Sequence, residues 1–132
     1  MKTGPILVVD DEPYIVRSLT YLLTREGYAV ESATNGEAGL ERARALKPPL
    51  VLLDIMMPGM DGYQLCQEIK RDPTLADTYV IILTARGQQV DRERAFLGGA
   101  DDFMTKPFSP QEVASRVRAV LRGETPARRA AG

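Results

Sequence analysis

Short apolar stretches alternate with amphipathic stretches along this chain, and this alternation constrains the fold more than any other feature of the sequence. The apolar stretches are rich in valine, isoleucine and leucine, which favours β-strands. The amphipathic stretches carry apolar residues three or four positions apart, which predicts helices. The predicted strands are Ile6 to Val9, Tyr28 to Ala33, Leu50 to Leu53, Tyr79 to Leu83 and Asp102 to Thr105, and the predicted helices are 13–25, 35–46, 62–71, 88–97 and 110–121.

Strict alternation of strands and helices, with continuously apolar central strands, predicts a parallel sheet with helices on both faces. The expected helix starts carry capping signals, in which a residue with a side-chain acceptor is followed three positions later by glutamate or glutamine. Three segments have this form, namely 34-TNGE-37, 61-DGYQ-64 and 109-SPQE-112. We therefore expect a three-layer α/β domain.

With 132 residues, the chain is long enough for one domain with its own hydrophobic core. We expect this domain to span residues 1–122, and the proline-containing segment 123–132 to form a flexible tail. No apolar run approaches the roughly 20 residues of a membrane-spanning helix. The N-terminus has no signal-peptide pattern, so we expect no membrane association and a cytoplasmic location.

The residue types limit the chemistry of the protein. The chain has no histidine and a single cysteine, Cys66, which excludes histidine-based catalytic triads and zinc sites built on imidazole or several thiolates. Cys66 is expected to be a small core residue. The net charge of −1 argues against direct nucleic-acid binding, although arginines gather between Arg116 and Arg129. Any metal ion would be a hard cation held by oxygen atoms.

Polar side chains follow the predicted strands at their carboxyl ends. Asp10 and Asp11 follow the first strand, Asp54 the third, Thr84 the fourth and Lys106 the fifth. In open α/β sheets, ligands bind outside the carboxyl ends of the strands, where the strand order reverses. If the strand order is 2-1-3-4-5, the first and third strands are neighbours, and the three carboxylates share one pocket.

Three carboxylates at close range repel one another unless a cation lies between them. Mg²⁺ suits such a site because it takes a few carboxylates and keeps positions for water and phosphate oxygens. Lys106 offers a second positive charge, Thr84 a hydroxyl donor and Asp54 a nucleophile, which together suit phosphoryl transfer. Each residue alone has a simpler explanation, such as an acidic helix start that complements the helix dipole. Their joint placement at four strand ends favours a functional site.

Four motifs at these places closely resemble the receiver domain of bacterial two-component response regulators. They are 7-LVVDDEP-13, 53-LDIMMPGMDG-62, 84-TARG-87 and 99-GADDFMTKPF-108, and the resemblance covers about residues 4–122. It implies a flavodoxin-like (βα)5 fold and a signalling domain rather than an enzyme. Such a domain takes a phosphoryl group from a phosphohistidine on a sensor histidine kinase or a phosphotransfer protein. The absence of histidine from this chain fits a donor located on another protein.

The resemblance assigns roles around the acidic pocket. Asp54 is the implied phosphoryl acceptor, and Lys106 is implied to contact the phosphoryl group. The Lys106–Pro107 peptide bond is expected to be cis. The implied Mg²⁺ ligands are Asp10, Asp11, Asp54 and the backbone carbonyl of Met56.

The resemblance also implies a conformational switch and residues that set the lifetime of the phosphoryl group. Thr84 is expected to move toward the phosphoryl group while Phe103 rotates inward, which changes the surface formed by the fourth helix, fifth strand and fifth helix. The residues two positions after the acceptor and after the threonine tune the lifetime of the phosphoryl group in this family. Here they are Met56 and Arg86, and neither side chain suits the alignment of an attacking water. We therefore expect slow autodephosphorylation, over minutes or longer.

The chain resembles the OmpR/PhoB-type subgroup, whose members dimerise through charged pairs on that same surface. Leu97 stands near a position where the subgroup usually has an acid, and the sequence shows no winged-helix output domain, so we expect a stand-alone receiver or a fragment. A solvated charged surface without dimerisation is the simpler alternative. The charges of the candidate homodimer face are Arg92, Asp101, Asp102, Glu112, Arg116 and Arg118. The expected phosphodonor contacts on the first helix are Tyr14, Ile15 and Arg17.

Three other functions are compared with this one. A pseudo-receiver would bind partners without phosphorylation, but such domains typically lack an acid or the lysine. A magnesium-dependent phosphatase of the haloacid dehalogenase type needs two acids separated by one residue after the first strand, whereas Asp10 and Asp11 are adjacent. A flavin carrier with this fold needs a first loop that binds phosphate, which Asp10, Asp11 and Glu12 would repel.

Overall fold

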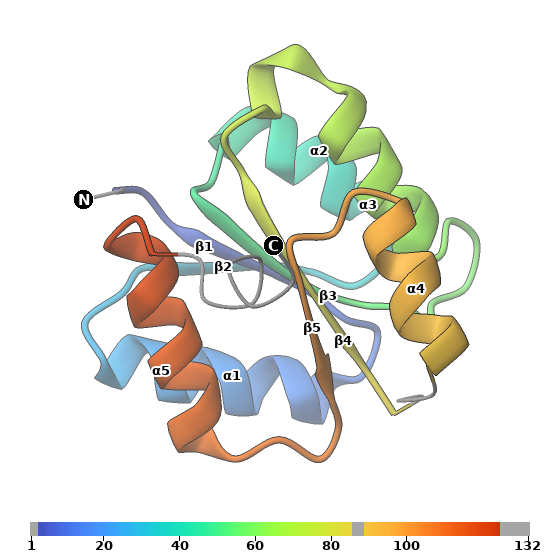
Figure 1. The fold of residues 1–132 in the computed structure, drawn as a ribbon. Helices are drawn as coiled ribbons and strands as arrows, with labels where there is room; N and C mark the ends of the chain where they lie inside the picture. The colour runs from blue at the N-terminus through green and yellow to red at the C-terminus, as the bar shows by residue number, and fades with distance from the viewer. Residues whose placement is uncertain (1–2, 86–88, 125–132) are drawn as a thin grey trace.

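The computed structural model describes residues 3–85 and 89–124, with the side chains of residues 89–92 left out of the description. Strands and helices alternate along this range (Figure 1). The strands are β1 (Ile6–Val9), β2 (Val30–Ala33), β3 (Leu50–Asp54), β4 (Tyr79–Thr84) and β5 (Asp102–Thr105). The helices are α1 (Pro13–Arg25), α2 (Gly36–Leu46), α3 (Gly62–Arg71), the 3-10 turn η1 (Pro73–Leu75), α4 (Gln89–Leu97) and α5 (Pro110–Leu121).

The five strands form one parallel sheet in the order β2-β1-β3-β4-β5. This confirms the predicted flavodoxin-like fold and strand order. Helices α1 and α5 cover one face of the sheet, and α2, α3 and α4 cover the other (Figure 1). Val9 of β1 pairs with Leu53 of β3. The next residues, Asp10 and Asp54, are thereby brought to the same edge of the sheet from neighbouring strands.

The hydrophobic core consists of one cluster on each face of the sheet. Along β1, Ile6 and Val8 belong to the cluster under α1 and α5, whereas Leu7 and Val9 belong to the cluster under α2, α3 and α4. All residues of β1, β3 and β4 are buried. These strands are continuously apolar because both of their faces are covered. The close packing gives the strand ends a rigid base.

The start of α2 differs from the prediction. Asn35, and not Thr34, is the N-cap, because its side-chain oxygen accepts a 2.7 Å hydrogen bond from the backbone N–H of Ala38. Both residue types can cap a helix, so the sequence pattern did not separate them. Glu37, which we expected to reach back to the cap, accepts a 3.3 Å hydrogen bond from the backbone N–H of Met60. It therefore supports the loop that follows β3.

The other two capping signals are confirmed. Asp61 and Gln64 form a capping box at the start of α3, and the Ser109 side chain accepts a hydrogen bond from the backbone N–H of Glu112 at the start of α5. Strand β2 is shorter than predicted. Tyr28 lies in the turn after α1, where its backbone N–H donates to the Leu23 carbonyl at 3.1 Å.

Helix α5 ends at Leu121, and the domain boundary at residue 122 stays a prediction. The first two residues of the predicted tail close the C-terminal end of α5, since the N–H of Gly123, which has a positive φ of 87°, donates to the carbonyl of Val120 and that of Glu124 to the carbonyl of Ala119. Residues 125–132 lie outside the described residues, so the flexibility of the tail stays a prediction. Within the described part of the chain, no helix has the length and apolar character needed to cross a membrane.

Candidate functional site

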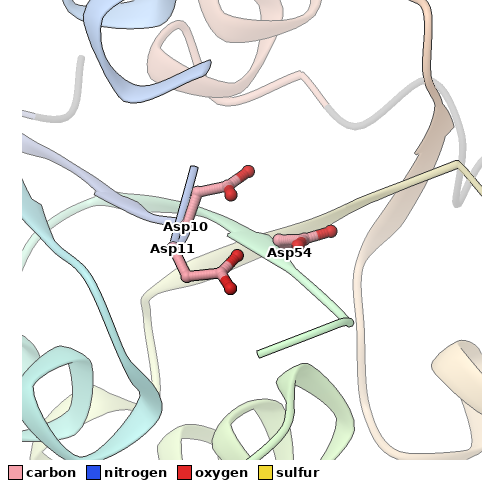
Figure 2. Close-up of side chains that lie close together, drawn as sticks. All are labelled: Asp10, Asp11 and Asp54. Carbon is pink, nitrogen blue, oxygen red and sulfur yellow. The ribbon is translucent and has the colours of Figure 1, made fainter. Parts of the chain in front are cut away.

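Three aspartate side chains lie together where β1 and β3 end (Figure 2). One carboxylate oxygen from each of Asp10, Asp11 and Asp54 lies within 4.8 Å of those of the other two. Asp10 and Asp54 are only 1% and 4% exposed, whereas Asp11 is exposed. The predicted acidic pocket is therefore present, with two carboxylates deep in the protein and one at the surface.

The loop after β3 closes tightly against the acceptor candidate. The backbone N–H groups of Met57 and Gly62 both donate to the carbonyl of Ile55, at 3.1 and 3.0 Å. A Cβ atom on Gly62 would lie 2.3 Å from the carbonyl oxygen of Asp54, a distance that real side chains do not tolerate. Only glycine therefore fits at position 62. Gly59 also serves the loop, because its φ of 76° is unfavourable for other residues.

Lys106 reaches the acidic pocket from β5. Its Nζ atom lies 3.1 Å from Oδ2 of Asp10 and 3.4 Å from Oδ1 of Asp54. The lysine is placed by its backbone, because its N–H donates to the carbonyl of Thr84 on β4 at 2.7 Å. The Lys106–Pro107 peptide bond is cis, as the resemblance implied. Asp10 also accepts a 2.9 Å hydrogen bond from the backbone N–H of Glu12, which fixes its carboxylate at the start of α1.

The electrostatics of the pocket leave negative charge uncompensated. Burial, and then the neighbouring charge of Asp10, raise the pKa of Asp54 from 3.8 to about 6, although Lys106 acts in the opposite direction. Burial alone would lower the pKa of Lys106, but its hydrogen bond with Asp10 and the charges of Asp10 and Asp54 outweigh burial and raise it. One lysine thus does not balance three carboxylates.

The donor atoms of the pocket fit a hard divalent cation. The cluster offers carboxylate oxygens only, and Mg²⁺ prefers such ligands. Two of the three residues, Asp10 and Asp54, are held in place at the ends of β1 and β3. Among residues 3–85 and 93–124, the cluster is the one group of three or more acidic or thiol side chains close enough to share a metal ion. The raised pKa of Asp54 points to the same need for positive charge.

The model of the response regulator receiver domain family matches residues 6–118 of the chain, which includes every element from β1 to most of α5. The chain belongs to this family. Domains of this family bind Mg²⁺ at an acidic pocket, work with histidine kinases and are in general not classical enzymes.

Known relatives of this receiver domain are longer regulators. The chain is 45% identical over 117 residues to the alkaline phosphatase synthesis transcriptional regulatory protein PhoP of Bacillus subtilis, covering 89% of this chain and 48% of that protein. It is 44% identical to the DNA-binding dual master transcriptional regulator RpaA of Synechocystis, with the same two coverages. These relatives are regulators of the OmpR/PhoB type. The chain spans about half the length of the curated relatives it matches.

A solved structure has the same fold. The signal receiver domain of a signal transduction histidine kinase from Syntrophus aciditrophicus superposes with a TM-score of 0.85 at 38% sequence identity, covering 92% of each chain. Receiver domains with this fold therefore occur in more than one kind of signalling protein.

The two candidate switch residues of the receiver domain are buried. Thr84 ends β4 with no exposed surface and pairs with Thr105 of β5. Phe103 is 4% exposed and lies in the core cluster under α2, α3 and α4, together with Ala95 of α4. The phenyl ring is thus already directed into the protein in this structure. That these residues form a switch stays a prediction.

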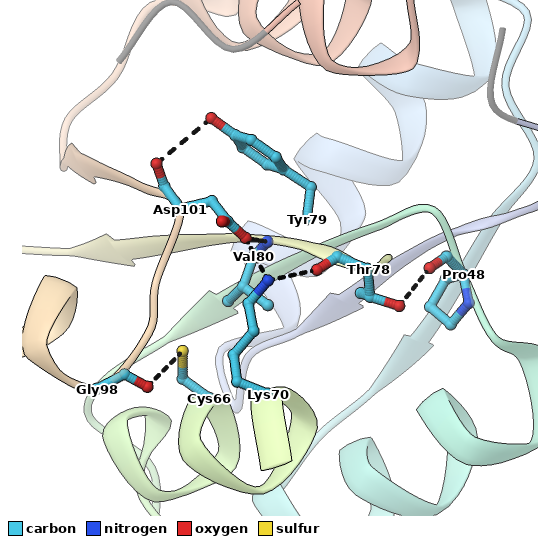
Figure 3. A network of polar contacts seen from close by, with 8 residues as sticks. All are labelled: Pro48, Cys66, Lys70, Thr78, Tyr79, Val80, Gly98 and Asp101. Atoms are coloured by element: carbon cyan, nitrogen blue, oxygen red, sulfur yellow. Dashed lines mark hydrogen bonds and ion pairs between the residues drawn. The ribbon is translucent and has the colours of Figure 1, made fainter. Parts of the chain in front are cut away.

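Most charges of the candidate dimer face have partners within the receiver domain. Asp102, which is buried, pairs with Arg116 at 2.6 Å. Asp101 pairs with Lys70 of α3 at 2.5 Å and accepts from the backbone N–H of Val80 at 2.9 Å, as Figure 3 shows. The remaining pairs on this face are Arg116 with Glu112 at 4.0 Å and Arg118 with Glu26 of α1 at 3.3 Å. Asp101 and Arg118 are therefore paired with residues outside the α4, β5 and α5 surface. The homodimer stays a prediction.

Several other predicted residues can be placed. The sulfur of Cys66 is buried and lies 3.8 Å from the carbonyl oxygen of Gly98, and burial raises the pKa of the thiol to about 12, which confirms a core role (Figure 3). The side chain of Met56 is 59% exposed beside the acidic pocket. Arg86 and the side chain of Arg92 lie outside the described residues.

A groove of about 500 Å³ runs between α1 and the segment after β5, and it reaches the pocket at Lys106. Tyr14, which is 73% exposed, and Ile15 line this groove, and Arg17 is exposed on the same helix. Tyr14 and Ile15 thus lie along a groove that leads to Lys106, whereas Arg17 does not line it. Their contact with a donor stays a prediction.

Two pairs were missed by sequence reasoning. Lys70 pairs with Asp101 and also donates to the carbonyl of Thr78 at 2.7 Å, so it joins α3 to the residue before β4 and to the turn before β5. The Arg94 guanidinium of α4 lies over the ring of Tyr63 of α3, 4.1 Å from its centroid. In each pair the partners are about 30 positions apart and belong to different elements, so no local pattern signals them.

Proposed function

We propose that this receiver domain accepts a phosphoryl group on Asp54 from a phosphohistidine of a sensor histidine kinase or a phosphotransfer protein. The observation that carries the proposal is the pairing of a single lysine with two buried aspartates from neighbouring strands. Lys106 lies within 3.4 Å of both Asp10 and Asp54. A buried acid with a raised pKa beside a cation is typical of a functional site.

Each residue of the pocket has its own role in the proposed phosphoryl transfer. A carboxylate oxygen of Asp54 forms the new P–O bond while the P–N bond of the donor breaks, and the imidazole leaves with the bonding electrons. Lys106 holds one phosphoryl oxygen, and the Thr84 hydroxyl donates to another after transfer. The carboxylates of Asp10, Asp11 and Asp54, with the Met56 carbonyl, would hold Mg²⁺, which supplies positive charge to the phosphoryl oxygens when bound.

The lifetime and output of the signal follow from the same residues. The exposed Met56 side chain offers no group to align an attacking water, so autodephosphorylation is slow in this proposal. In this proposal, phosphorylation moves Thr84 toward the phosphoryl group and stabilises the inward position of Phe103, which alters the α4, β5 and α5 surface. The domain would act on partners in the cytoplasm and not by binding nucleic acid itself. Because the acids and Lys106 are all present, a phosphorylation-independent pseudo-receiver is the weaker alternative.

Intact-mass measurement after incubation with acetyl phosphate and Mg²⁺ tests this function. We expect the wild-type chain to gain the mass of one phosphoryl group, and Asp54→Asn or addition of EDTA to abolish the gain. After removal of the donor, the added mass should persist for minutes or longer. A wild-type chain that gains no mass would favour the pseudo-receiver. Loss of the added mass within seconds would contradict slow autodephosphorylation.

The proposed homodimer is tested separately by sedimentation with and without beryllofluoride, which stands in for the phosphoryl group. A shift to a dimer with beryllofluoride would support the surface of α4, β5 and α5, and Arg116→Ala should then weaken it. Arg116 already pairs with Asp102, so dimerisation must compete with an internal ion pair. An unchanged monomer at high protein concentration refutes the dimer.

A further inference from the structure

A second groove, of about 480 Å³, runs along the loop after β3 and ends at the acidic pocket. Asp11, which belongs to that pocket, lines the groove together with Asp61, Met56, Tyr63 and Arg94. The groove lies between the β3–α3 loop and α4, away from the groove beside α1. It therefore offers a separate approach to the carboxylates, of a size that suits a small molecule.

Arg94 is the one basic residue among the described residues that line this groove. Its guanidinium carbon lies 4.1 Å from the centroid of the Tyr63 ring. The Tyr63 ring is fixed because the residue is only 6% exposed and belongs to the core cluster. Stacking on a fixed ring holds the cation at the groove while Arg94 stays exposed to solvent.

The positive charge of Arg94 offsets the negative charges of the groove for an approaching anion. A small phosphodonor is an anion, and along this groove it passes two carboxylates, those of Asp11 and Asp61, on its way to Asp54. Like charges lower the local concentration of such a donor, and a fixed cation at the entrance raises it. The Tyr63 stack keeps this cation beside the path of the donor.

We propose that Arg94, held on Tyr63, is a specificity-determining residue that attracts and positions small anionic phosphodonors, such as acyl phosphates, for transfer to Asp54. This inference rests on the proposed function of Asp54 as acceptor. In the reaction, an Asp54 oxygen forms the new P–O bond, the bond between phosphorus and the acyl oxygen breaks, and the acid leaves as its carboxylate. Arg94 takes no part in bond formation and acts on the donor before transfer.

The test measures the rate of Asp54 phosphorylation by intact mass over a range of acetyl phosphate concentrations, at fixed Mg²⁺ and low ionic strength. For Arg94→Gln we expect the half-saturating donor concentration to rise about threefold, as expected for one exposed charge near a multiply charged anion. The maximal rate should stay unchanged, because the bond-forming groups are intact. Arg94→Lys, which keeps the positive charge, should have a half-saturating donor concentration close to that of wild type. High salt should abolish the difference between Arg94→Gln and wild type.

Arg25→Gln is the matched control. Arg25 is an exposed arginine over a tyrosine ring, 5.6 Å from the centroid of Tyr21, at the far end of α1, and it lines neither groove. Its removal changes the net charge equally but should leave the half-saturating concentration as in wild type. Tyr63→Phe keeps the ring and should also behave as wild type, whereas Tyr63→Leu frees the guanidinium and should resemble Arg94→Gln.

The outcomes separate the two proposals. If the wild-type chain is not phosphorylated at all, the function of Asp54 fails. If the wild type is phosphorylated but Arg94→Gln and Arg25→Gln give the same donor dependence at low salt, the role of Arg94 is overturned. An equal rise in the half-saturating donor concentration for Arg94→Gln and Arg94→Lys, insensitive to salt and accompanied by a lower melting temperature, would also overturn it. Arg94 would then only join α4 to α3.

Discussion

Replacing Gly62 with alanine is expected to destabilise the folded protein by about 3 kcal/mol and to impair phosphorylation of Asp54. The added Cβ would lie 2.3 Å from the carbonyl oxygen of Asp54 and 2.7 Å from the Cα of Ile55. Both neighbours are backbone atoms, which cannot turn away as a flexible side chain can. The loop must therefore shift at the acceptor itself, and a misplacement of about 1 Å can lower a reaction rate by about 100-fold.

Urea unfolding and the intact-mass assay would measure these two effects. Gly98→Ala is the matched control, because a Cβ there would meet its nearest atoms at an ordinary 3.5 Å. Its free energy of unfolding should change by less than about 0.5 kcal/mol. A Gly62→Ala protein as stable as Gly98→Ala, with normal phosphorylation, would show that the loop after β3 can relax without cost.

Asp54→Asn is expected to stabilise the protein in the absence of metal. The pKa of Asp54 is about 6 in the folded protein against an ordinary value of 3.8, chiefly because of burial and then Asp10. Between these pH values the folded protein keeps a proton that the unfolded chain has lost, so stability falls as the pH rises through this window. Above it the whole cost is present, at most about 3 kcal/mol. Asparagine carries no charge and avoids this cost.

Urea unfolding in EDTA would test the sign and the pH window. The free energy of unfolding of Asp54→Asn should exceed that of wild type by about 2 to 3 kcal/mol near pH 8 and by little near pH 4. Asp72→Asn is the contrasting control, since hydrogen bonds from Thr74 lower the pKa of Asp72 and its charged form is favoured. That substitution should give no stabilisation. Equal stability of Asp54→Asn and wild type near pH 8 would mean that the folded protein accommodates the ionised acid.

The fold could be predicted from the sequence because its signals are local and repeated. The apolar segment 50–53 and its counterparts predicted four of the strands to within a residue at each end. The strand order was implied by the resemblance to receiver domains, because the alternation of strands and helices by itself does not fix it. The errors occurred where two local solutions are nearly equal in energy, as between Thr34 and Asn35 at the start of α2.

The sequence predicted that Asp10, Asp54 and Lys106 lie together, whereas their roles stay predictions. Asp10 and Lys106 each follow a strand, Asp54 is the last residue of β3, and parallel strands bring their carboxyl ends to one edge. The sequence did not predict how charge is distributed among them. The raised pKa of Asp54 depends on burial and on the distance to Asp10, neither of which a residue type specifies.

The sequence by itself thus determined the fold class, the family and the residues at the strand ends, because these depend on periodicity and on motifs of adjacent residues. Only the tertiary structure decided the partners of long side chains. It assigned Asp101 to Lys70 and Arg94 to Tyr63, and it placed the carbonyl of Asp54 against Gly62. These contacts depend on how helices and loops distant in the chain pack together. A flexible charged side chain has several partners within reach, and packing alone selects one of them.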